Sequence, residues 1–362
     1  MKYSLIVPVF NRPDEVDELL ESLTRQTLKD FEVVIVEDGS EVRCEEVVKR
    51  YAGQLDVHYF EKPNSGPGQS RNYGAERSRG EYLIVLDSDV VLPEGYLAEV
   101  EKELSANPCE AFGGPDRAHE SFTPVQKAIN YSMTSFFTTG GIRGGKKKLD
   151  KFYPRSFNMG IKKTLYQQLD GFSNMRFGED IDFSIRIFKS GSRCRLFPEA
   201  WVWHKRRTDF RKFFRQVHNS GIARINLYKK YPDSLKLVHL LPAVFTVGVA
   251  VLAAIFLTGM IFTAIGLWAG YCSSTGCNMG LIVAYMGGAL MALALLPLLL
   301  YSLIILVDSA LQNRSLRVGL LSIPASFIQL LGYGSGFLRA WWLRCILGRN
   351  EELQAFKKTF YK

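Results

Sequence analysis

Two aspartates separated by one residue, Asp87 and Asp89, follow the apolar run of residues 83–86. Side chains at positions i and i+2 of an extended segment point to the same side. The two carboxylates could therefore hold one hard divalent cation such as Mg²⁺ or Mn²⁺, and that cation could carry a diphosphate. The same pattern is also typical of a strand that simply ends in a turn, where aspartate is common.

The segments before this pair predict a parallel sheet. Residues 3–10 form a continuous apolar run, as expected for a strand buried on both faces. Pro13 marks a helix start, a second apolar run covers residues 32–37, and a helical pattern surrounds residues 47–51. This alternation of strand and helix predicts an α/β fold with a parallel sheet.

Polar residues stand where the predicted strands end, namely Asn11, Asp38, Asp87 and Asp89. Ligands of open parallel sheets bind beyond the carboxyl ends of the strands, so these side chains are expected to share one crevice. A dinucleotide-binding oxidoreductase would carry a G-x-G-x-x-G turn after the first strand. Residues 8–13 read PVFNRP instead, which argues against that class.

Residues 66–72, with the sequence GPGQSRN, predict an anion-binding turn before a helix. Glycine lets the backbone approach a ligand closely, and the first amide groups of a helix attract anions. Arg71 can add a charge-assisted bond to a phosphate or a ribose-side oxygen. Asp38 can accept a hydrogen bond from a nucleobase. The ordinary alternatives are a solvated arginine and a turn aspartate.

Glu179 and Asp180 precede an apolar stripe at helical spacing that stops at Gly191. Asp180 could serve only as the N-cap of this helix, a role compatible with catalysis. Asp182 lies one step into the helix and is expected to be structural or to face an acceptor. His204 follows an apolar segment, where a histidine is most often structural.

These motifs, in this order and spacing, resemble an inverting family 2 glycosyltransferase with the GT-A fold over about residues 2–232. The matching segments are IVPVFN (6–11), VEDGS (36–40), GPGQSRNYG (66–74), DSD (87–89), NMG (158–160) and GEDID (178–182). The resemblance implies a nucleotide-diphospho-sugar transferase fold, which is a mostly parallel sheet flanked by helices.

The resemblance also implies roles for individual residues. Asp180 is the expected general base, and Asp89, Asp87 and His204 are the expected ligands of Mg²⁺ or Mn²⁺. The expected donor-binding residues are Pro8, Asn11, Asp38, Gly68, Arg71, Asn72 and Asp87. The expected acceptor side comprises Asn158, Met159, Glu179 and Asp182.

The last third of the chain has a different composition. No Asp, Glu, Lys or Arg occurs in the 71 residues 237–307, and a helix needs about 20 apolar residues to cross a bilayer. We expect crossings near residues 240–262 and 281–307. A third apolar stretch, 318–338, contains Pro324, Gly332, Gly334 and Gly336 and is expected to be re-entrant or interfacial rather than fully crossing. The predicted divisions are a catalytic domain (1–232), a membrane region (233–344) and a basic tail (345–362).

Ten Lys or Arg residues between positions 205 and 236 face only two Asp. A basic flank beside a first crossing belongs in the cytoplasm and favours contact with anionic membrane lipids. We therefore expect a multi-pass protein of the plasma (inner) membrane with a cytoplasmic catalytic domain. The net charge of +9 needs no nucleic acid partner to explain it. Cys44, Cys109 and Cys194 are expected to be reduced, whereas Cys272 and Cys277 flank the link between the two crossings.

The expected function is metal-dependent, inverting transfer of a hexose or N-acetylhexosamine from a nucleotide-diphosphate sugar. The donor is expected to be linked to UDP, and the acceptor to be a hydroxyl of a membrane-associated or lipid-linked glycan, as in polysaccharide biosynthesis. The alternatives are a polyprenyl-phosphate sugar synthase and a non-catalytic sugar-nucleotide-binding membrane protein. Processive enzymes of this family carry a Q-x-x-R-W motif. Here Gln216 is followed by VHNS, so processivity is not expected.

Overall fold

The computed structural model describes residues 1–117, 122–140, 153–272 and 279–351. It divides into two compact units. The first comprises Met1–Phe122, Lys146–Arg206 and Asn350–Lys362, and the second comprises Thr123–Gly145 and Arg207–Arg349. The predicted division at residue 232 differs from this one, because residues 207–232 group with the apolar helices of the second unit.

The first unit is built on a seven-stranded sheet with the order β3-β2-β1-β4-β8-β6-β9. Strands β1 to β4 are parallel, β8 is antiparallel to both β4 and β6, and β9 is parallel to β6. The expected mostly parallel sheet flanked by helices is confirmed. The strands are β1 (Tyr3–Val9), β2 (Phe31–Asp38), β3 (Val57–Lys62), β4 (Tyr82–Leu86), β6 (Ala111–Gly113), β8 (Asn158–Lys162) and β9 (Cys194–Leu196).

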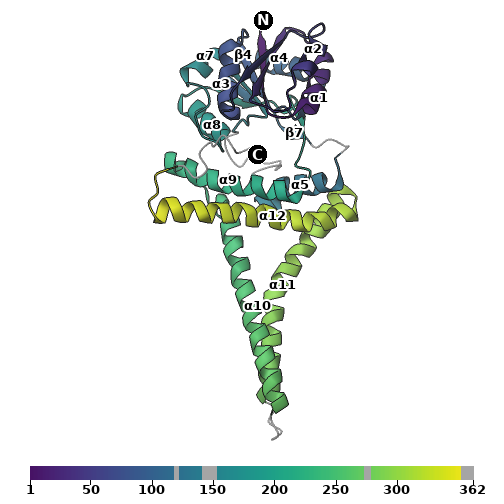
Figure 1. Cartoon of the computed structure of the whole chain (residues 1–362), viewed down its shortest axis with the longest axis vertical. Coiled ribbons are helices and arrows are strands. Elements are labelled where there is room, and N and C mark those ends of the chain that lie inside the picture. The colour runs from purple at the N-terminus through teal and green to yellow at the C-terminus, as the bar shows by residue number, and fades with distance from the viewer. Residues whose placement is uncertain (118–121, 141–152, 273–278, 352–362) are drawn as a thin grey trace. The chain divides into compact units, whose positions relative to one another are not determined.

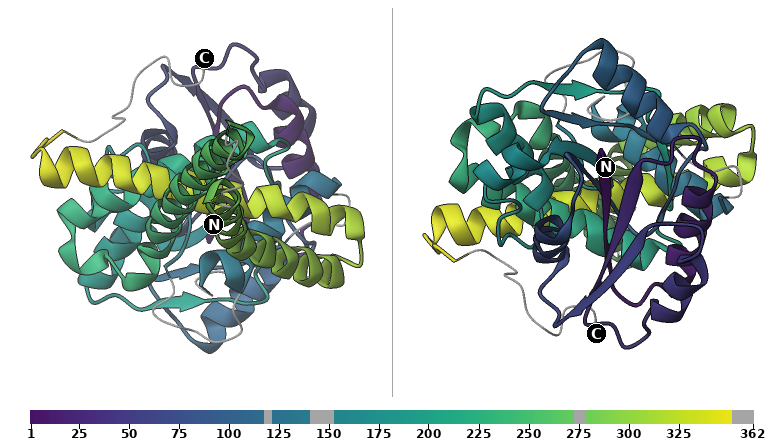
Figure 2. Two further views of the ribbon diagram at one scale, coloured as in Figure 1. Left: turned by 90° about the horizontal axis from the view of Figure 1, so that it is seen from below. Right: turned by 90° about the horizontal axis from the view of Figure 1, so that it is seen from above.

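Both faces of this sheet are covered, which explains why its strands are continuously apolar. In β1, Leu5 and Val7 face a core with Leu20 of α1, whereas Ile6 faces a second core with Phe183 of α8. Figures 1 and 2 show the helices around the sheet. The helices of this unit are α1 (Pro13–Thr24), α2 (Glu45–Tyr51), α3 (Pro67–Arg77), α4 (Tyr96–Ala106), α7 (Lys163–Gln168) and α8 (Glu179–Lys189).

A second, three-stranded sheet has the order β5-β10-β7 and consists of β5 (Val90–Val91), β10 (Val202–His204) and β7 (Asp116–Arg117). In its register His204 lies opposite Val90, the residue after Asp89. The small sheet therefore places a histidine from late in the chain beside the aspartates that follow β4.

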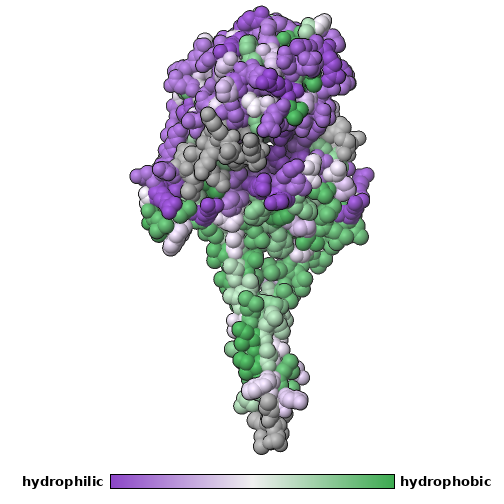
Figure 3. Space-filling model, in the orientation of Figure 1, coloured by the Kyte–Doolittle hydropathy of each residue, from purple (hydrophilic) through white to green (hydrophobic). Residues whose placement is uncertain are grey.

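The second unit is helical. Its elements are α5 (Pro124–Thr134), α6 (Phe136–Thr139), α9 (Phe210–Lys230), α10 (Leu241–Cys272), α11 (Met279–Asn313), α12 (Leu316–Trp341), two short 3₁₀ turns at Pro232–Ser234 and Leu237–His239, and a π-helical turn at Trp342–Ile346. Helices α10 and α11 pack along each other. Their outer surface is hydrophobic (Figure 3).

Three helical stretches in the described residues are long and apolar enough to cross a membrane, Leu237–Tyr271, Met279–Asn313 and Leu316–Ile346. The third differs from the other two in its packing. Helix α12 runs side by side with α9 and across the α10–α11 hairpin (Figures 1 and 2). Whether it crosses a membrane therefore stays a prediction.

The glycines of α12 are packing positions and do not break the helix, which continues through Pro324. A Cβ atom on Gly336 would lie 2.0 Å from the carbonyl oxygen of His218 in α9, and one on Gly221 would lie 2.1 Å from that of Tyr333. Both distances are too short for any side chain. The helices α9 and α12 approach so closely because each offers a glycine to the other.

Candidate active site

The aspartates after β4 meet the histidine at the end of β10. The Nε2 atom of His204 lies 3.2 Å from Asp89 Oδ1 and 4.0 Å from Asp87 Oδ2. Asp87, Asp89 and His204 each offer a ligand atom within 4.8 Å of the others. Two carboxylates and an imidazole are a suitable donor set for a divalent cation. The structure therefore brings together the three residues predicted as metal ligands.

Arg12 also contacts this group, although the sequence patterns did not single it out. Its Nη1 atom lies 2.6 Å from Asp89 Oδ2. Burial disfavours the charged form of Asp89, but His204 and Arg12 outweigh it and hold the pKa of Asp89 well below its usual range. Burial lowers the pKa of His204, yet Asp89 and Asp116 raise it to about 9. A metal ion at Nε2 would compete with that proton.

Arg71 of α3 links the aspartates to the start of α8. Its guanidinium is 3% exposed, with Nη2 lying 2.8 Å from Asp87 Oδ1 and Nη1 lying 3.1 Å from Glu179 Oε1. The predicted role was a bond to a phosphate or ribose oxygen. In the structure the two terminal nitrogens instead bond two carboxylates, so Arg71 holds Asp87 and Glu179 in fixed positions.

Helix α8 begins after Gly178, whose φ of 83° favours glycine. Gly178 is therefore the N-cap, and the alternative N-cap role of Asp180 is wrong. Asp180 Oδ2 accepts a hydrogen bond of 2.6 Å from Arg155 Nε, and Oδ1 accepts one of 2.8 Å from the Ile181 amide. Arg155, like Arg12, was not predicted from the sequence.

The pKa values of the neighbours Glu179 and Asp180 shift in opposite directions. Burial and the charge of Asp180 raise the pKa of Glu179 to about 7. Burial acts on Asp180 as well, but Arg155 outweighs it and lowers the pKa of Asp180. Asp180 is therefore the carboxylate of the pair that stays ionised at neutral pH.

Comparison with known proteins identifies a family domain in part of the chain. Residues 4–169 match the family model described as Glycosyl transferase family 2. The chain carries a family 2 glycosyltransferase domain. An uncharacterized glycosyltransferase of Haemophilus influenzae is 33% identical over 196 residues, which cover 52% of this chain and 63% of that protein.

Two further proteins resemble this chain, one over a quarter of its length and the other over most of it. The poly(ribitol-phosphate) beta-N-acetylglucosaminyltransferase TarS of Staphylococcus aureus is 38% identical over 93 residues, 25% of this chain and 16% of TarS. The mannosyltransferase of Pyrobaculum calidifontis, solved with GDP-Man and Mn²⁺, shares the fold with a TM-score of 0.54 and 18% identity, covering 91% of this chain and 87% of that one. The chain thus spans less than two thirds of the length of each of these curated sequence relatives.

Several predicted donor-binding residues of the family 2 domain bond to neighbouring loops. Asp38 accepts hydrogen bonds of 2.9 Å from the amides of Ser65 and Gly66 and pairs with Lys62 at 2.5 Å. Its carboxylate thereby anchors the start of α3. The predicted contact with a nucleobase would use the lone pairs that remain.

The side-chain amides of Asn11 and Asn72 also form hydrogen bonds with the backbone of neighbouring loops. Asn11 has a φ of 53° and accepts bonds from the amides of Glu41 and Val42. Asn72 accepts from the Phe172 amide at 2.8 Å and donates to its carbonyl at 2.8 Å. Both asparagines therefore hold neighbouring loops in place.

The two remaining predicted donor-side positions are set by the backbone. Pro8 lies in β1 opposite Val36. A Cβ atom on Gly68 would lie 3.4 Å from Phe172 Cβ, an ordinary van der Waals contact, so packing against Phe172 does not require glycine there.

Three residues predicted for the acceptor side are fully buried. Asn158 accepts a hydrogen bond from Tyr96 and donates one to the Ala200 carbonyl. Met159 lies in the core, and Asp182 pairs with Arg186 at 3.0 Å. The burial of these three side chains argues against direct contact with an acceptor. For Asp182 it favours the structural alternative. Glu179, which is 9% exposed, remains beside Asp180 in the site.

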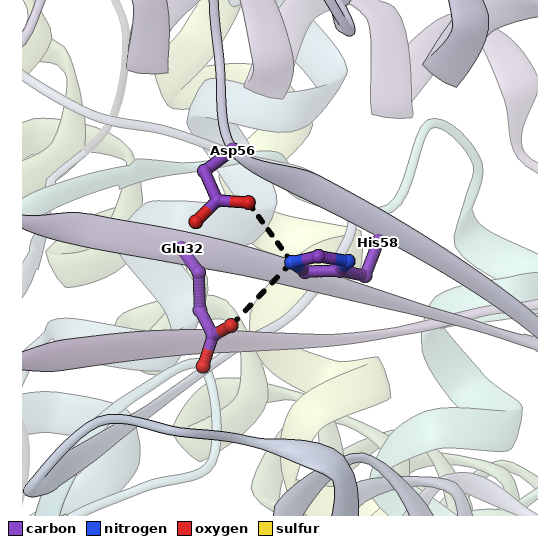
Figure 4. A group of neighbouring side chains, drawn as sticks. All are labelled: Glu32, Asp56 and His58. Atoms are coloured by element: carbon purple, nitrogen blue, oxygen red, sulfur yellow. Dashed lines mark ion pairs between the residues drawn. The ribbon is translucent and has the colours of Figure 1, made fainter. Parts of the chain in front are cut away.

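Figure 4 shows a second group of possible metal ligands, Glu32, Asp56 and His58. Glu32 lies near the start of β2 and His58 near the start of β3, away from the carboxyl ends of these strands. His58 Nε2 lies 2.9 Å from Asp56 and 3.5 Å from Glu32. Arg79 bonds to both carboxylates, at 2.7 Å to Glu32 and 2.6 Å to Asp56. The guanidinium already supplies the positive charge, so we assign this group a structural role.

Proposed function

We propose that this chain is an inverting glycosyltransferase that moves a sugar from a nucleotide-diphosphate sugar to an acceptor hydroxyl. One observation carries the proposal, namely that Arg71 joins Asp87 to Glu179. This contact supports the proposal, because it joins Asp87, a predicted metal ligand, to the residue next to the predicted base Asp180. The metal ligands would act at the leaving diphosphate and the base at the acceptor hydroxyl of a single displacement.

Asp87, Asp89 and His204 would hold Mg²⁺ or Mn²⁺. When bound, the ion would supply charge stabilisation to the leaving diphosphate. The donor set within 4.8 Å supports this assignment, as does the Mn²⁺ in the mannosyltransferase that shares the fold. The protein itself keeps Asp89 ionised at neutral pH and fixes Asp87 through Arg71.

Asp180 is the proposed general base. The acceptor hydroxyl loses its proton to the Asp180 carboxylate while its oxygen bonds to the sugar carbon and the bond to the nucleotide diphosphate breaks on the opposite face. One carboxylate suffices because inversion is a single displacement. Arg155 supports this role by keeping Asp180 ionised.

The proposed donor is a UDP-linked hexose or N-acetylhexosamine. The name of TarS, an N-acetylglucosaminyltransferase, supports the N-acetylhexosamine. The proposed acceptor is a membrane-associated or lipid-linked glycan, since the same chain carries the apolar helices α10 and α11. These helices also favour a second candidate, a polyprenyl-phosphate sugar synthase, whose acceptor is the lipid phosphate itself.

We further propose that α10 and α11 cross the plasma (inner) membrane and that the catalytic unit faces the cytoplasm. The ten Lys or Arg residues between positions 205 and 236 support this orientation. Helix α12 is proposed to lie at the interface, because it runs along the basic helix α9 and across the hairpin. Its basic partner would contact anionic lipid headgroups.

A panel of UDP-GlcNAc, UDP-glucose and GDP-mannose, incubated with the purified chain and a membrane lipid extract, tests this function. We expect nucleotide release that needs a divalent cation, an acceptor fraction and one donor of the panel. The anomeric configuration of the product, read by NMR, should be inverted. Metal-independent turnover or a retained configuration would contradict the mechanism, and binding without turnover would favour a non-catalytic protein.

A further inference from the structure

The His204 ring has a second polar neighbour on the side away from the two aspartates of the site. Its Nδ1 atom lies 3.8 Å from Asp116 Oδ2. We propose that Asp116 is a positioning residue that accepts the Nδ1–H of His204 and so presents Nε2 to a divalent cation. This inference rests on the proposed function, because it presumes that His204 is a metal ligand.

The small sheet places Asp116 next to the histidine. Strands β7 and β10 are parallel, with Asp116 opposite Val202, two residues before His204. The two nitrogens of the ring therefore face carboxylates on opposite sides, Asp89 at Nε2 and Asp116 at Nδ1. This arrangement comes from two strands far apart in sequence.

The chemistry of the imidazole ring explains why His204 needs a second carboxylate, that of Asp116. A histidine that ligates through Nε2 carries its proton on Nδ1, and metal-bound histidines usually donate that proton to a carboxylate, a carbonyl or water. The Nδ1 atom of His204 is buried and has no hydrogen-bond partner among the described residues. A separation of 3.8 Å is longer than a hydrogen bond. Asp116 is the acceptor that a modest movement of either side chain would bring into range.

Two neighbours limit rotation of these two side chains away from each other. Arg206 is 8% exposed and lies 2.6 Å from Asp116 Oδ2, so it fixes the carboxylate. The ring of Phe157 lies against the His204 imidazole with a centroid distance of 5.0 Å and a tilt of 31°. The carboxylate and the imidazole thus have restricted orientations before any ligand arrives.

The test is Mn²⁺ affinity, measured by electron paramagnetic resonance with the full chain in the presence of UDP or of GDP. Asp116→Ala should weaken Mn²⁺ binding about 10–100-fold, the usual effect of removing the partner of a metal-bound histidine. Asp116→Asn keeps an oxygen acceptor and should recover part of the loss. Nucleotide binding measured in chelator should be unchanged in both variants.

Glu110→Ala is the matched control, because Glu110 is also a partly buried carboxylate paired with an arginine, Arg193 at 3.0 Å, and it does not face His204. A structural role for Asp116 would lower the melting temperature without a specific change in Mn²⁺ affinity. The predicted positioning role lowers Mn²⁺ affinity while Glu110→Ala leaves it unchanged.

The outcomes separate this inference from the proposed function. If Asp89→Asn abolishes Mn²⁺ binding and Asp116→Ala leaves it intact, the positioning role is overturned and the metal site stands. If the wild-type chain binds no Mn²⁺ with either nucleotide, the metal site itself is overturned and the inference falls with it.

Discussion

Arg155 donates a hydrogen bond of 2.6 Å from its Nε to the carboxylate of Asp180. The arginine comes from the segment before β8 and the aspartate from the first turn of α8, so the contact depends on the tertiary fold. It has a chemical consequence, since the guanidinium keeps the proposed base ionised.

Replacing Arg155 should therefore change the pH dependence of transfer. With Arg155→Met the pKa of Asp180 rises, fewer molecules carry an ionised base at acidic pH, and the acid limb of the kcat profile moves to higher pH. The measurement is kcat against pH at saturating donor. Arg193→Met, which removes an exposed arginine paired with Glu110, is the control and should leave the profile in place. An unchanged acid limb in Arg155→Met would separate Arg155 from the base.

Asp89→Asn tests the metal assignment. The neutral amide is a weaker ligand for a hard cation, so donor binding in Mn²⁺ should fall and transfer should fall about 10²-fold or more. Isothermal titration of the nucleotide with and without Mn²⁺ gives the comparison. Wild-type transfer that persists in chelator would contradict the assignment.

Glu32 offers a test of stability away from the site. It is fully buried, and hydrogen bonds from Ser4 and Arg79 outweigh burial and lower its pKa. Since the folded-state pKa lies below the unfolded one, this stabilisation is present above about pH 4.5 and disappears as the pH falls further. Glu32→Gln should lower the free energy of unfolding by about 1–3 kcal/mol at neutral pH.

The stability difference between Glu32→Gln and the wild type should shrink in acid, as measured by chemical denaturation at pH 7 and pH 4. Glu101→Gln, at a part-buried carboxylate bonded to Lys2 and Tyr3, is a comparison with a smaller expected cost. A difference that stays constant with pH would show that the charge of Glu32 is not responsible.

A reporter fused after Lys362 tests the membrane topology. If only α10 and α11 cross, both termini lie on the catalytic side, and a reporter that is active in the cytoplasm should be active there. The cations after α12, such as Arg344 and Arg349, favour the same side. Activity solely outside the cytoplasm would make α12 a third crossing.

The sequence predicted those parts of the fold and site that follow from local pattern. Buried strands β1, β2 and β4 have continuous apolar runs, and polar residues follow them. The structure confirms these strands. The long apolar helices α10 and α11 were likewise predictable from their length and lack of charge.

The missed parts depend on contacts between distant segments. Arg12 and Arg155 have no motif, and only the folded chain brings them within 2.6 Å of Asp89 and Asp180. Arg12 had one available signal, because it follows Asn11 at the end of a strand adjacent to β4. The glycines of α12 were interpreted as signs of a re-entrant or interfacial segment, although Gly332 and Gly336 have the G-x-x-x-G spacing that allows close helix packing. The link between α10 and α11, which contains Cys277, lies outside the described residues.

The most direct test of the central claim is the Asp180→Asn variant, assayed for nucleotide-sugar binding and for transfer in parallel. The amide keeps the size of the side chain but cannot take a proton, so binding of donor and Mn²⁺ should persist while transfer at saturation falls about 10²–10⁴-fold. Loss of donor affinity with unchanged transfer at saturation would contradict the account and make Asp180 a binding residue.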